Sequence, residues 1–446
     1  MKTARPDVTA AMDRRRFLFG TGLTVAGMAL ACRSYAESSS TPAVVSPNDL
    51  DDWQKVRAQF ALASDYINMS GFFLASHPRP VREAIENYRR ALDADPFAVV
   101  EKEEFGSRLR VEGLVAEYLG GKPEEVALTD STTMGLALVY HGLTFKKGQE
   151  ILTTAHDHYA QHESIRLATA RSGASVRKIR LFDDYNSISS DEIVGRIHKG
   201  ISPATRVVGL TWVHSSSGLR LPIRRIADAI AEVNRQRGEA DRVLLVVDGV
   251  HGLGAVDETV AQLGADFFAA GTHKWMFGPR GTGIIWAKRE NWKLLQPVIP
   301  SFSEGPYGAW MEGRSLGATE AQWVSPGGFH SFEHRWALPA AFAFHRQIGR
   351  ARVAERISSL NQMTKEELGK IPGVQVHTPR DPELSAGLIC FDVDGMKPAA
   401  VVAKLLEKRV IASESPYGLS HARLSPSLLN DEKQIEQTLG YIRALS

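Results

Sequence analysis

A lysine and an aspartate, each beside an apolar run, are the residues of this sequence that most clearly indicate chemistry. Asp248 ends the run 243–247, and Lys274 lies in the turn 272–275, ahead of a further apolar strand at 283–286. A lysine in such a turn can hold an aldehyde covalently, and the carboxylate can keep a pyridine nitrogen protonated. Either residue alone would indicate only an ordinary turn. Together they predict a site for pyridoxal 5'-phosphate (PLP).

A second group of polar residues opens a predicted helix. The segment 130–135 follows the apolar run 126–129 and contains Thr132 and Thr133. Backbone N–H groups at a helix N-terminus, together with two hydroxyls, form a site suited to the phosphate of a cofactor. Taken alone, the segment indicates simple helix capping by Ser131 or Thr132.

Three histidines occur within seven residues after the run 151–154. They are His156, His158 and His162. Such a cluster could hold a metal ion, but carboxylate and cysteine partners at metal-ligand spacing are missing. The sequence therefore predicts no metal site.

These residues need a scaffold, and apolar runs that alternate with helical patterns supply one. Strands are predicted at 126–129, 151–154, 176–179, 207–213, 243–247, 267–270 and 283–286. Several are apolar on both faces, which is typical of a buried, largely parallel sheet covered by helices. Residues 221–236 have helical periodicity and form one crossover. The fold class is predicted to be α/β.

The predicted sheet belongs to a large domain over residues 71–336, followed by a smaller α+β domain over 337–446. The smaller domain has predicted strands at 387–393, 410–413 and 422–425. An N-terminal segment, 50–70, is expected to join it. Residues 300–331, rich in Gly, Ser, Pro and aromatic side chains, break the alternation. Because long loops in compact domains are usually functional, we expect this segment to form a wall or lid of the active site.

The N-terminus has the three regions of an export signal in their usual order. Residues 13–18 resemble the twin-arginine pattern, 19–31 are apolar, and 34–36 form a small-x-small cleavage site. The apolar region is too short to be a convincing membrane span. We expect a twin-arginine (Tat) signal peptide over 1–36, a tether over 37–49, the Tat export machinery as a partner and a periplasmic location. Lipid attachment at Cys32 ranks second.

Composition and charge exclude some function classes. The sequence is 43% hydrophobic and 23% charged, which is ordinary for a globular protein, and its formal net charge is +2. Six basic and two acidic residues fall within 1–36, so the remainder is close to neutral. A near-neutral body gives no electrostatic reason to expect a nucleic-acid partner. Cleavage of the leader would leave Cys390 as the only cysteine, so no intrachain disulfide is expected.

The motifs resemble those of class V aminotransferases, PLP enzymes of fold type I that include cysteine desulfurases and isopenicillin N epimerase. The resemblance covers about residue 60 to the C-terminus. It implies the PLP-dependent transferase fold of type I, with a mainly parallel seven-stranded sheet in the large domain, a smaller α+β domain and a homodimer. It also implies an enzyme of the class V aminotransferase kind, with PLP as its cofactor.

The resemblance assigns roles to individual residues. Lys274, Asp248 and His158 are implied to be catalytic, with His158 stacked on the cofactor ring. The implied cofactor contacts are Thr132, Thr133, His158, Ser215, Asp248, His251, His273 and Lys274. Arg423, in an Arg-x-Ser-Pro pattern, is implied to clamp the substrate carboxylate; taken alone it indicates a surface arginine at a strand end.

Two departures from the family pattern affect the expected chemistry. Ser215 stands where many relatives have Asn against the ring hydroxyl, so that contact is weaker or supplied elsewhere. The segment 410–419 contains no cysteine, although desulfurases place their nucleophile there. Cys390 lies in an apolar strand and is expected in the core. A cysteine persulfide mechanism is therefore disfavoured.

The leader and the PLP motifs together resemble the periplasmic PLP enzymes that mature pyoverdine-type peptide siderophores. The expected function is modification of the free amino group of a glutamate side chain in such a siderophore. The alternative within the enzyme class is a PLP-dependent lyase or epimerase of a small amino acid. The alternative outside it is a catalytically silent binding protein of the same fold.

Overall fold

Seven strands form the central sheet of the computed structural model, which describes residues 50–446 except 107, 184, 186 and 187. Their order is β2-β8-β7-β6-β5-β3-β4, and β8 runs antiparallel to both of its neighbours while the other neighbouring pairs are parallel. The strands are β2 (Val126–Thr129), β3 (Glu150–Thr154), β4 (Ser175–Ile179), β5 (Thr205–Thr211), β6 (Leu244–Asp248), β7 (Phe267–Gly271) and β8 (Gly283–Ala287). The predicted strands and the α/β class are confirmed, with strand ends shifted by at most two residues. The predicted leader and tether lie outside the described residues.

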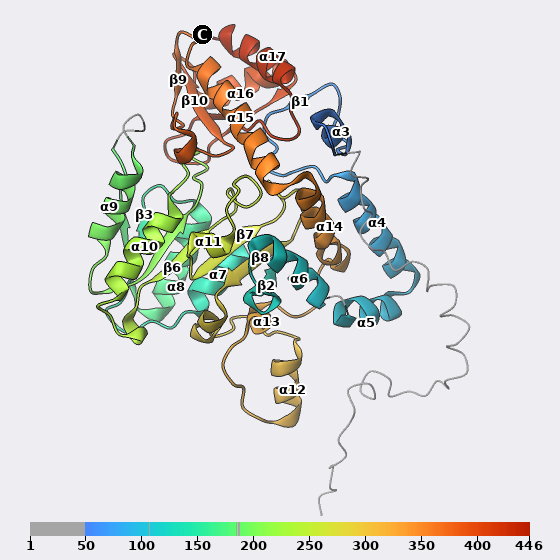
Figure 1. The fold of residues 1–446 in the computed structure, drawn as a ribbon, viewed down its shortest axis with the longest axis vertical. Helices are drawn as coiled ribbons and strands as arrows, with labels where there is room; N and C mark the ends of the chain where they lie inside the picture. Colours follow the sequence, from blue (N-terminus) through green and yellow to red (C-terminus); the bar gives the residue numbers. More distant parts are fainter. Residues whose placement is uncertain (1–49, 107, 184, 186–187) are drawn as a thin grey trace, which may run out of the picture. The chain divides into compact units, whose positions relative to one another are not determined.

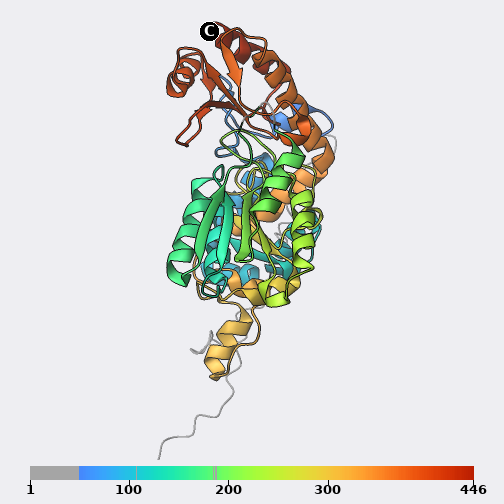
Figure 2. The same cartoon turned by 90° about the vertical axis from the view of Figure 1, so that its left-hand side faces the viewer.

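Helices cover both faces of this sheet (Figures 1 and 2). They are α6 (Arg108–Leu119), α7 (Thr132–Gly142), α8 (Tyr159–Ser172), α9 (Ser190–Gly200), α10 (Ile223–Asn234), α11 (Val260–Leu263) and α14 (Phe332–Ile348). Two further helices, α4 (Arg79–Ala94) and α5 (Pro96–Gly106), pack against α14. Successive residues of β6 alternate between two cores, with Leu244 and Val246 in one and Leu245 and Val247 in the other. This alternation explains why the strand is apolar throughout.

The smaller sheet, in the C-terminal part, is antiparallel and has the order β12-β13-β10-β9. Its strands are β9 (Val374–Val376), β10 (Ile389–Val393), β12 (Ser413–Glu414) and β13 (Ala422–Leu424), with α15 (Arg350–Leu368), α16 (Pro398–Glu407) and α17 (Glu432–Arg443) packed near it. The N-terminal segment contributes α3 (Trp53–Ala58) and β1 (Ile67–Asn68), and β1 pairs with β11 (Val410–Ile411). The predicted strand 410–413 is thus divided between β11 and β12. The predicted boundary at 336/337 falls inside α14.

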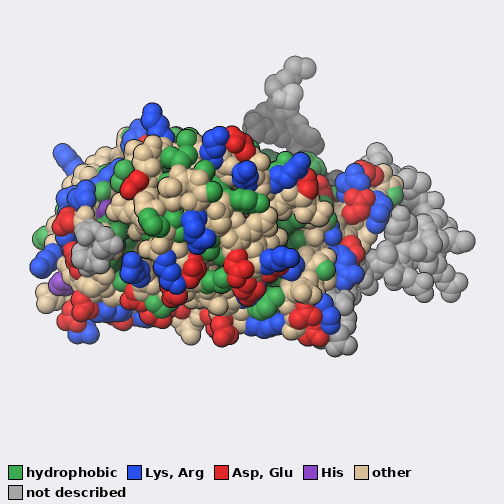
Figure 3. All heavy atoms as spheres, turned by 90° about the horizontal axis from the view of Figure 1, so that it is seen from above, with side chains coloured by type: hydrophobic (Ala, Val, Ile, Leu, Met, Phe, Trp, Pro, Cys, Tyr) green, Lys and Arg blue, Asp and Glu red, His purple; other side chains and the backbone are tan. Residues whose placement is uncertain are grey.

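Short 3₁₀ turns connect several of these elements: η2 (Pro123–Glu125), η4 (Glu239–Asp241), η5 (Arg289–Leu294) and η6 (Pro382–Leu384). Among the described residues, no helix combines the length and apolarity needed to cross a membrane. On the face drawn in Figure 3, acidic and basic side chains are interspersed with hydrophobic ones.

The segment 300–331 contains two helices, α12 (Glu304–Glu312) and α13 (Ala321–Val324). Figure 1 places α12 at the end of the central sheet opposite to the C-terminal strands and helices. Next to α13, the Ser325 hydroxyl accepts a hydrogen bond from the backbone N–H of Leu128 in β2 at 2.9 Å. Within this chain α12 thus lies at the other end of the sheet from the C-terminal strands, while Arg335, just after the segment, lies 3.5 Å from Asp130, which precedes α7. The expected wall or lid stays a prediction.

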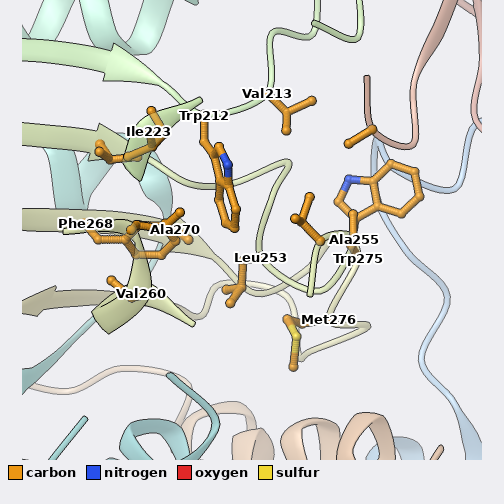
Figure 4. Packing of buried hydrophobic residues seen from close by; sticks show 14 of the residues in the cluster. Trp212, Val213, Ile223, Leu253, Ala255, Val260, Phe268, Ala270, Trp275 and Met276 are labelled. Atoms are coloured by element: carbon orange, nitrogen blue, oxygen red, sulfur yellow. The ribbon is translucent and has the colours of Figure 1, made fainter. Parts of the chain in front are cut away.

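Large side chains fill the core beneath the turns that follow β6 and β7 (Figure 4). Trp212, Phe268 and Trp275 are at most 2% exposed, and the rings of Trp212 and Phe268 meet edge to face. Gly252 lies in the turn after β6, and a Cβ atom there would lie 2.0 Å from Cε3 of Trp212. The turn that positions the site therefore requires glycine at this position.

We expect Gly252→Ala to lower the free energy of unfolding by at least about 1–3 kcal/mol, because the added methyl group overpacks against an indole that has no room to move. Chemical denaturation would measure this as a lower midpoint. Gly113→Ala is the matched control, since Gly113 lies in α6 with open space around its Cα, and it should be neutral or slightly stabilising. An unchanged midpoint for Gly252→Ala would contradict the packing described here.

Candidate active site

Asp248 and Lys274 meet at the carboxyl edge of the central sheet. Asp248 is the last residue of β6, and Lys274 follows the neighbouring strand β7 by three residues. Parallel strands bring such positions to one edge, where α/β proteins place their ligand sites. Asp248 is 2% exposed and accepts a hydrogen bond from the backbone N–H of Val250 at 3.1 Å. Burial raises the pKa of its carboxyl group to about 6, opposed by the charge of Lys274.

Lys274 contacts His251, and the groups around His251 determine which of its ring nitrogens carries the proton. The indole N–H of Trp275 can only donate, and it lies 3.3 Å from Nδ1 of His251, which must accept. In a neutral imidazole the proton is then on Nε2, which lies 3.0 Å from Nζ of Lys274. Burial moves the pKa of His251 well below its usual value, so the ring is neutral. Its Nε2–H therefore donates to Lys274, and the geometry fits the neutral amine.

The pKa of Lys274 agrees with this assignment. Its pKa is lowered to about 8, chiefly by burial; the charge of Asp248 opposes the shift and that of Arg423 adds to it. A neutral amine is the nucleophilic form of lysine and the form that can act as a base. Lys274 is thus prepared for covalent chemistry close to neutral pH.

A pH dependence of cofactor uptake follows. Because the lowered pKa makes Lys274 neutral above about pH 8, the rate at which apoprotein takes up PLP should rise about tenfold per pH unit below that value and flatten above it. Stopped-flow absorbance on apoprotein would record the rate. The reaction of PLP with a simple amine in solution gives the dependence that the cofactor itself contributes. A rate that is flat with pH after this correction would contradict the neutral-lysine geometry.

The turn that carries Lys274 is fixed by its own hydrogen bonds. The hydroxyl groups of Thr272 and Thr282 lie 2.5 Å apart, and the Thr282 hydroxyl donates to the carbonyl of Pro279 at 2.6 Å. Phe277 has φ 54°, in the left-handed region, and its buried ring packs edge to face on Phe60 at 5.0 Å. The sequence between β7 and β8 thus forms a rigid support, as a covalent attachment point requires.

The predicted phosphate ligands gather at the N-terminus of α7. Ser131 caps this helix by accepting from the N–H of Met134, and Thr132 Oγ1 accepts from the N–H of Gly271 at 2.7 Å. A Cβ on Gly271 would lie 2.7 Å from Cε1 of His273 and 3.2 Å from Thr132 Oγ1. The structure therefore brings Thr132 and His273 together. Nδ1 of His273 is buried without a hydrogen-bond partner in the described chain, as expected of a group that awaits a ligand. Thr133, the next residue, is exposed.

His158 lies at the end of β3 and caps α8. Its Nδ1 accepts from the N–H of Ala160 at 3.2 Å, so Nε2 carries the proton of the neutral ring. Burial lowers its pKa to about 4, and the charges of Lys274 and Arg423 act in the same direction. His158 is thus neutral near pH 7, as a ring that stacks on an aromatic cofactor should be.

The other two histidines of this cluster have separate partners. The His156 ring stacks on Phe182 at 4.2 Å, and its Nε2 accepts from the N–H of Leu181. His162 Nε2 lies 2.8 Å from the carbonyl of Thr154.

Arg423 in β13 is a buried cation that lacks a carboxylate partner in the described part of the chain. It is 4% exposed, and it donates to the backbone carbonyls of Ser215 and Glu414 at 2.8 Å each. Its guanidinium lies over the ring of Phe72, 4.8 Å from the ring centre. Burial lowers the pKa of Arg423. A buried charge of this kind calls for an anion, which a substrate carboxylate would supply.

Sequence reasoning missed Tyr417 and Phe72. The Tyr417 hydroxyl lies 2.8 Å from Oγ of Ser215, and its ring meets His158 edge to face at 5.9 Å. Phe72 contacts both Arg423 and the ring of His251, 5.6 Å away. Tyr417 lies in the segment 410–419, which lacks the cysteine of desulfurases. An aromatic residue in that segment was the signal that could have found it.

The residues present fit PLP. Lys274 offers a prepared amine, Asp248 a buried carboxylate for a ring nitrogen, and the α7 N-terminus with the unpartnered Nδ1 of His273 offers donors for a phosphate. Ser215 adds a hydroxyl group that forms a hydrogen bond with the hydroxyl group of Tyr417. The predicted residues other than Thr133 therefore lie together, whereas Thr133 is exposed and its role as a phosphate ligand stays a prediction.

Comparisons with known proteins agree with this geometry. The family model described as "Aminotransferase class-V" matches residues 75–443. Isopenicillin N epimerase of Streptomyces clavuligerus is 26% identical over 409 residues, which cover 89% of this chain and 98% of the relative. A probable cysteine desulfurase of Pyrococcus abyssi is 24% identical over 410 residues, covering 88% of this chain and 97% of the relative. Among solved structures, a mutant of C-DES with glycine covalently linked to its PLP cofactor has a TM-score of 0.79 at 23% identity, covering 87% of this chain and 98% of that one.

Proposed function

The chain belongs to the aminotransferase class-V family and is an enzyme with PLP as its cofactor, and we propose that it removes the α-proton of a small amino acid in an epimerisation or an elimination. One observation carries the proposal: the buried guanidinium of Arg423, without a carboxylate partner among the described residues, lies close enough to Lys274 to lower the pKa of its amine. A cation for a carboxylate beside an amine that can accept a proton is the arrangement that an α-amino acid requires.

Each residue has a distinct task in this proposal. Bound PLP would withdraw electrons from the α-carbon of the substrate. Asp248 would hold a proton on the ring nitrogen, and His158 would keep the ring in place. Arg423 would orient the substrate carboxylate, and Lys274 would accept the α-proton. Tyr417 keeps a neutral phenol beside Ser215, because burial raises its pKa.

The thiol chemistry of desulfurases is disfavoured. Cys390, the one cysteine in the described chain, is fully buried in β10, and burial raises the pKa of its thiol to about 12. Thiolates, not thiols, are nucleophiles, so Cys390 cannot accept sulfur near neutral pH. Relatives named isopenicillin N epimerase and a solved structure described as the cystine C-S lyase C-DES are consistent with an epimerase or a lyase. Other relatives are named probable cysteine desulfurase, so the case against a desulfurase rests on Cys390.

Product analysis would test the proposal. Purified enzyme would be incubated with a panel of L- and D-amino acids, and the products separated by chiral chromatography with parallel assays of ammonia and 2-oxo acid. Inversion of configuration supports an epimerase, and release of ammonia with a 2-oxo acid supports a lyase. Formation of a 2-oxo acid without ammonia, and only when a second 2-oxo acid is supplied, would overturn the proposal in favour of an aminotransferase.

Arg423→Lys should weaken substrate binding more than it slows the chemical step. A lysine cannot supply the planar fork that holds a carboxylate through two parallel bonds, so we expect KM to rise about 10–100-fold with a smaller fall in kcat. Steady-state kinetics on the best substrate of the panel would measure both constants. Arg443→Lys, at an exposed position near the end of α17, is the matched control. Equal KM values for Arg423→Lys and wild type would contradict the assigned role.

The twin-arginine pattern at 13–18 favours a second substrate, a peptide siderophore of the pyoverdine type, acted on in the periplasm. The aromatic side chains of α12 add no support for it, since this helix lies at the other end of the sheet. Independently of the substrate, we propose that the chain is exported by the Tat pathway. Mass spectrometry of the mature N-terminus in periplasmic extracts would support it if cleavage follows Ala36. Recovery of the uncleaved chain in the cytoplasm would contradict it.

We also propose that the enzyme is a homodimer, as the resemblance implies. Light scattering during size-exclusion chromatography should give twice the mass of the chain, and the mass of a single chain would contradict the proposal.

A further inference from the structure

Three side chains that the reaction does not use come together in the C-terminal sheet. His377 follows β9, Asp392 is in β10 and His421 precedes β13. Oδ2 of Asp392 lies 2.7 Å from Nε2 of His377 and 2.9 Å from Nδ1 of His421. One ligand atom from each residue lies within 4.8 Å of the other two. Two imidazoles and one carboxylate therefore converge on one point.

The pairing of the strands explains why these residues meet. Phe391 pairs with Ala422 and Cys390 with Arg423, so Asp392 lies opposite His421 in the antiparallel ladder. Ile389, Phe391 and Val393 are in the core of this part of the chain. Because side chains alternate along a strand, Asp392 and His421 point to the other face, which is the face that carries Arg423. The cluster is thus next to the residue assigned to the substrate carboxylate.

The hydrogen bonds within the cluster leave two of its buried polar atoms without a partner in the described chain. Both imidazoles contact the same carboxylate oxygen, while Oδ1 of Asp392 and Nε2 of His421 are buried with no partner in the described chain. His421 is 2% exposed, and the rings of His377 and His421 stack at 4.0 Å. Leaving two buried polar atoms unpaired costs about 1–3 kcal/mol each. The contacts within the described chain therefore leave part of the binding capacity of Asp392 and His421 unused.

We propose that His377, Asp392 and His421 bind one divalent transition-metal ion of the zinc type. Imidazole and carboxylate are the ligands that zinc prefers beside thiolate, and three protein ligands leave a fourth position open for water or substrate. Zinc bonds of about 2.0–2.1 Å place tetrahedral ligand atoms about 3.3 Å apart. The two imidazole nitrogens lie 2.7 and 2.9 Å from Oδ2 of Asp392, so each would move away from it by only about 0.4–0.6 Å.

The inference departs from the sequence prediction of no metal site, and it is independent of the PLP chemistry. The three residues are spread over 45 positions of the chain, from 377 to 421, so no motif spacing reveals them. An ion there would lie beside the carboxylate subsite and could hold a second polar group of the substrate.

Calorimetric titration of zinc chloride into untagged, chelator-treated holoenzyme tests the proposal. We expect one ion per chain, with affinity reduced at least about 100-fold in Asp392→Asn and in His377→Ala. His198→Ala, at an exposed position in α9, is the matched control and should bind as wild type does. Circular dichroism and the cofactor absorbance would verify folding, and Asp392→Asn preserves the shape of the side chain.

A second readout separates this site from adventitious binding. Zinc should raise the melting temperature of wild type and of His198→Ala but not of Asp392→Asn, because only an ion bound to the native site stabilises the fold. Failure of the wild type to bind zinc, or equal binding by Asp392→Asn and wild type, would overturn the proposal. Either result would leave the PLP assignment intact, since neither measurement depends on catalysis.

Discussion

Lys274→Ala is expected to abolish the covalent bond to the cofactor and to reduce kcat by more than about 10⁴-fold, because one residue supplies both the attachment point and the base. In the structure this amine accepts a hydrogen bond from His251, and burial lowers its pKa to about 8. Borohydride reduction followed by peptide mass spectrometry would detect the bond. Wild type should carry the cofactor on the peptide that contains Lys274, and the variant should carry none.

The matched control is Lys293→Ala, which removes an exposed lysine in η5. It should retain both the covalent cofactor and the activity of wild type. Retention of a reduced cofactor on another peptide of Lys274→Ala would show that a different lysine holds it, and the assignment of the site would then be wrong.

Asp248→Asn is the second substitution with a large expected effect. The amide has the shape of the carboxylate but carries no charge, so it cannot hold a proton on the ring nitrogen of the cofactor. Loss of one electrostatic contribution of this kind costs about 10²–10³ in kcat. We expect at least this loss, with KM changed much less, and steady-state kinetics would measure both constants. The visible spectrum of the bound cofactor should change as well, because the ring loses its proton.

Asp266→Asn provides the control for Asp248→Asn. Asp266 is also a buried carboxylate, but it precedes β7 at the amino edge of the sheet and pairs with Arg242. Asp266→Asn should lower the free energy of unfolding without changing the cofactor spectrum. Wild-type kcat in Asp248→Asn would contradict the proposed role of this carboxylate.

Hydrophobic pattern predicts most of the scaffold because the strands of the central sheet are buried on both faces. The runs at 126–128 and 243–247 are apolar, and the strands at these positions, β2 and β6, have every residue buried. Asp248 and Lys274 follow neighbouring strands, so the rule that carboxyl edges meet is sufficient to place them together. Fold and central chemistry could thus be predicted from local sequence.

Other parts of the site depend on contacts between distant segments. Phe72 reaches Arg423 across 351 positions of sequence, and Tyr417 reaches Ser215 across 202. No local pattern encodes such a contact. The composition of 300–331 is a related case, since an irregular, aromatic sequence indicates a special segment but not the end of the sheet at which its helices lie.

The central claim is that Lys274 removes the α-proton of an amino acid held by Arg423. Proton NMR in deuterated water, with the amino acid panel and a catalytic amount of enzyme, tests it most directly. With wild type we predict loss of the α-proton signal of at least one small amino acid, and with Lys274→Ala we predict none. With Arg423→Lys the signal should be lost slowly at low substrate concentration, and the exchange rate should approach that of wild type at high substrate concentration. Undiminished exchange with Lys274→Ala, or no exchange of any amino acid with PLP-loaded wild type, would contradict the claim.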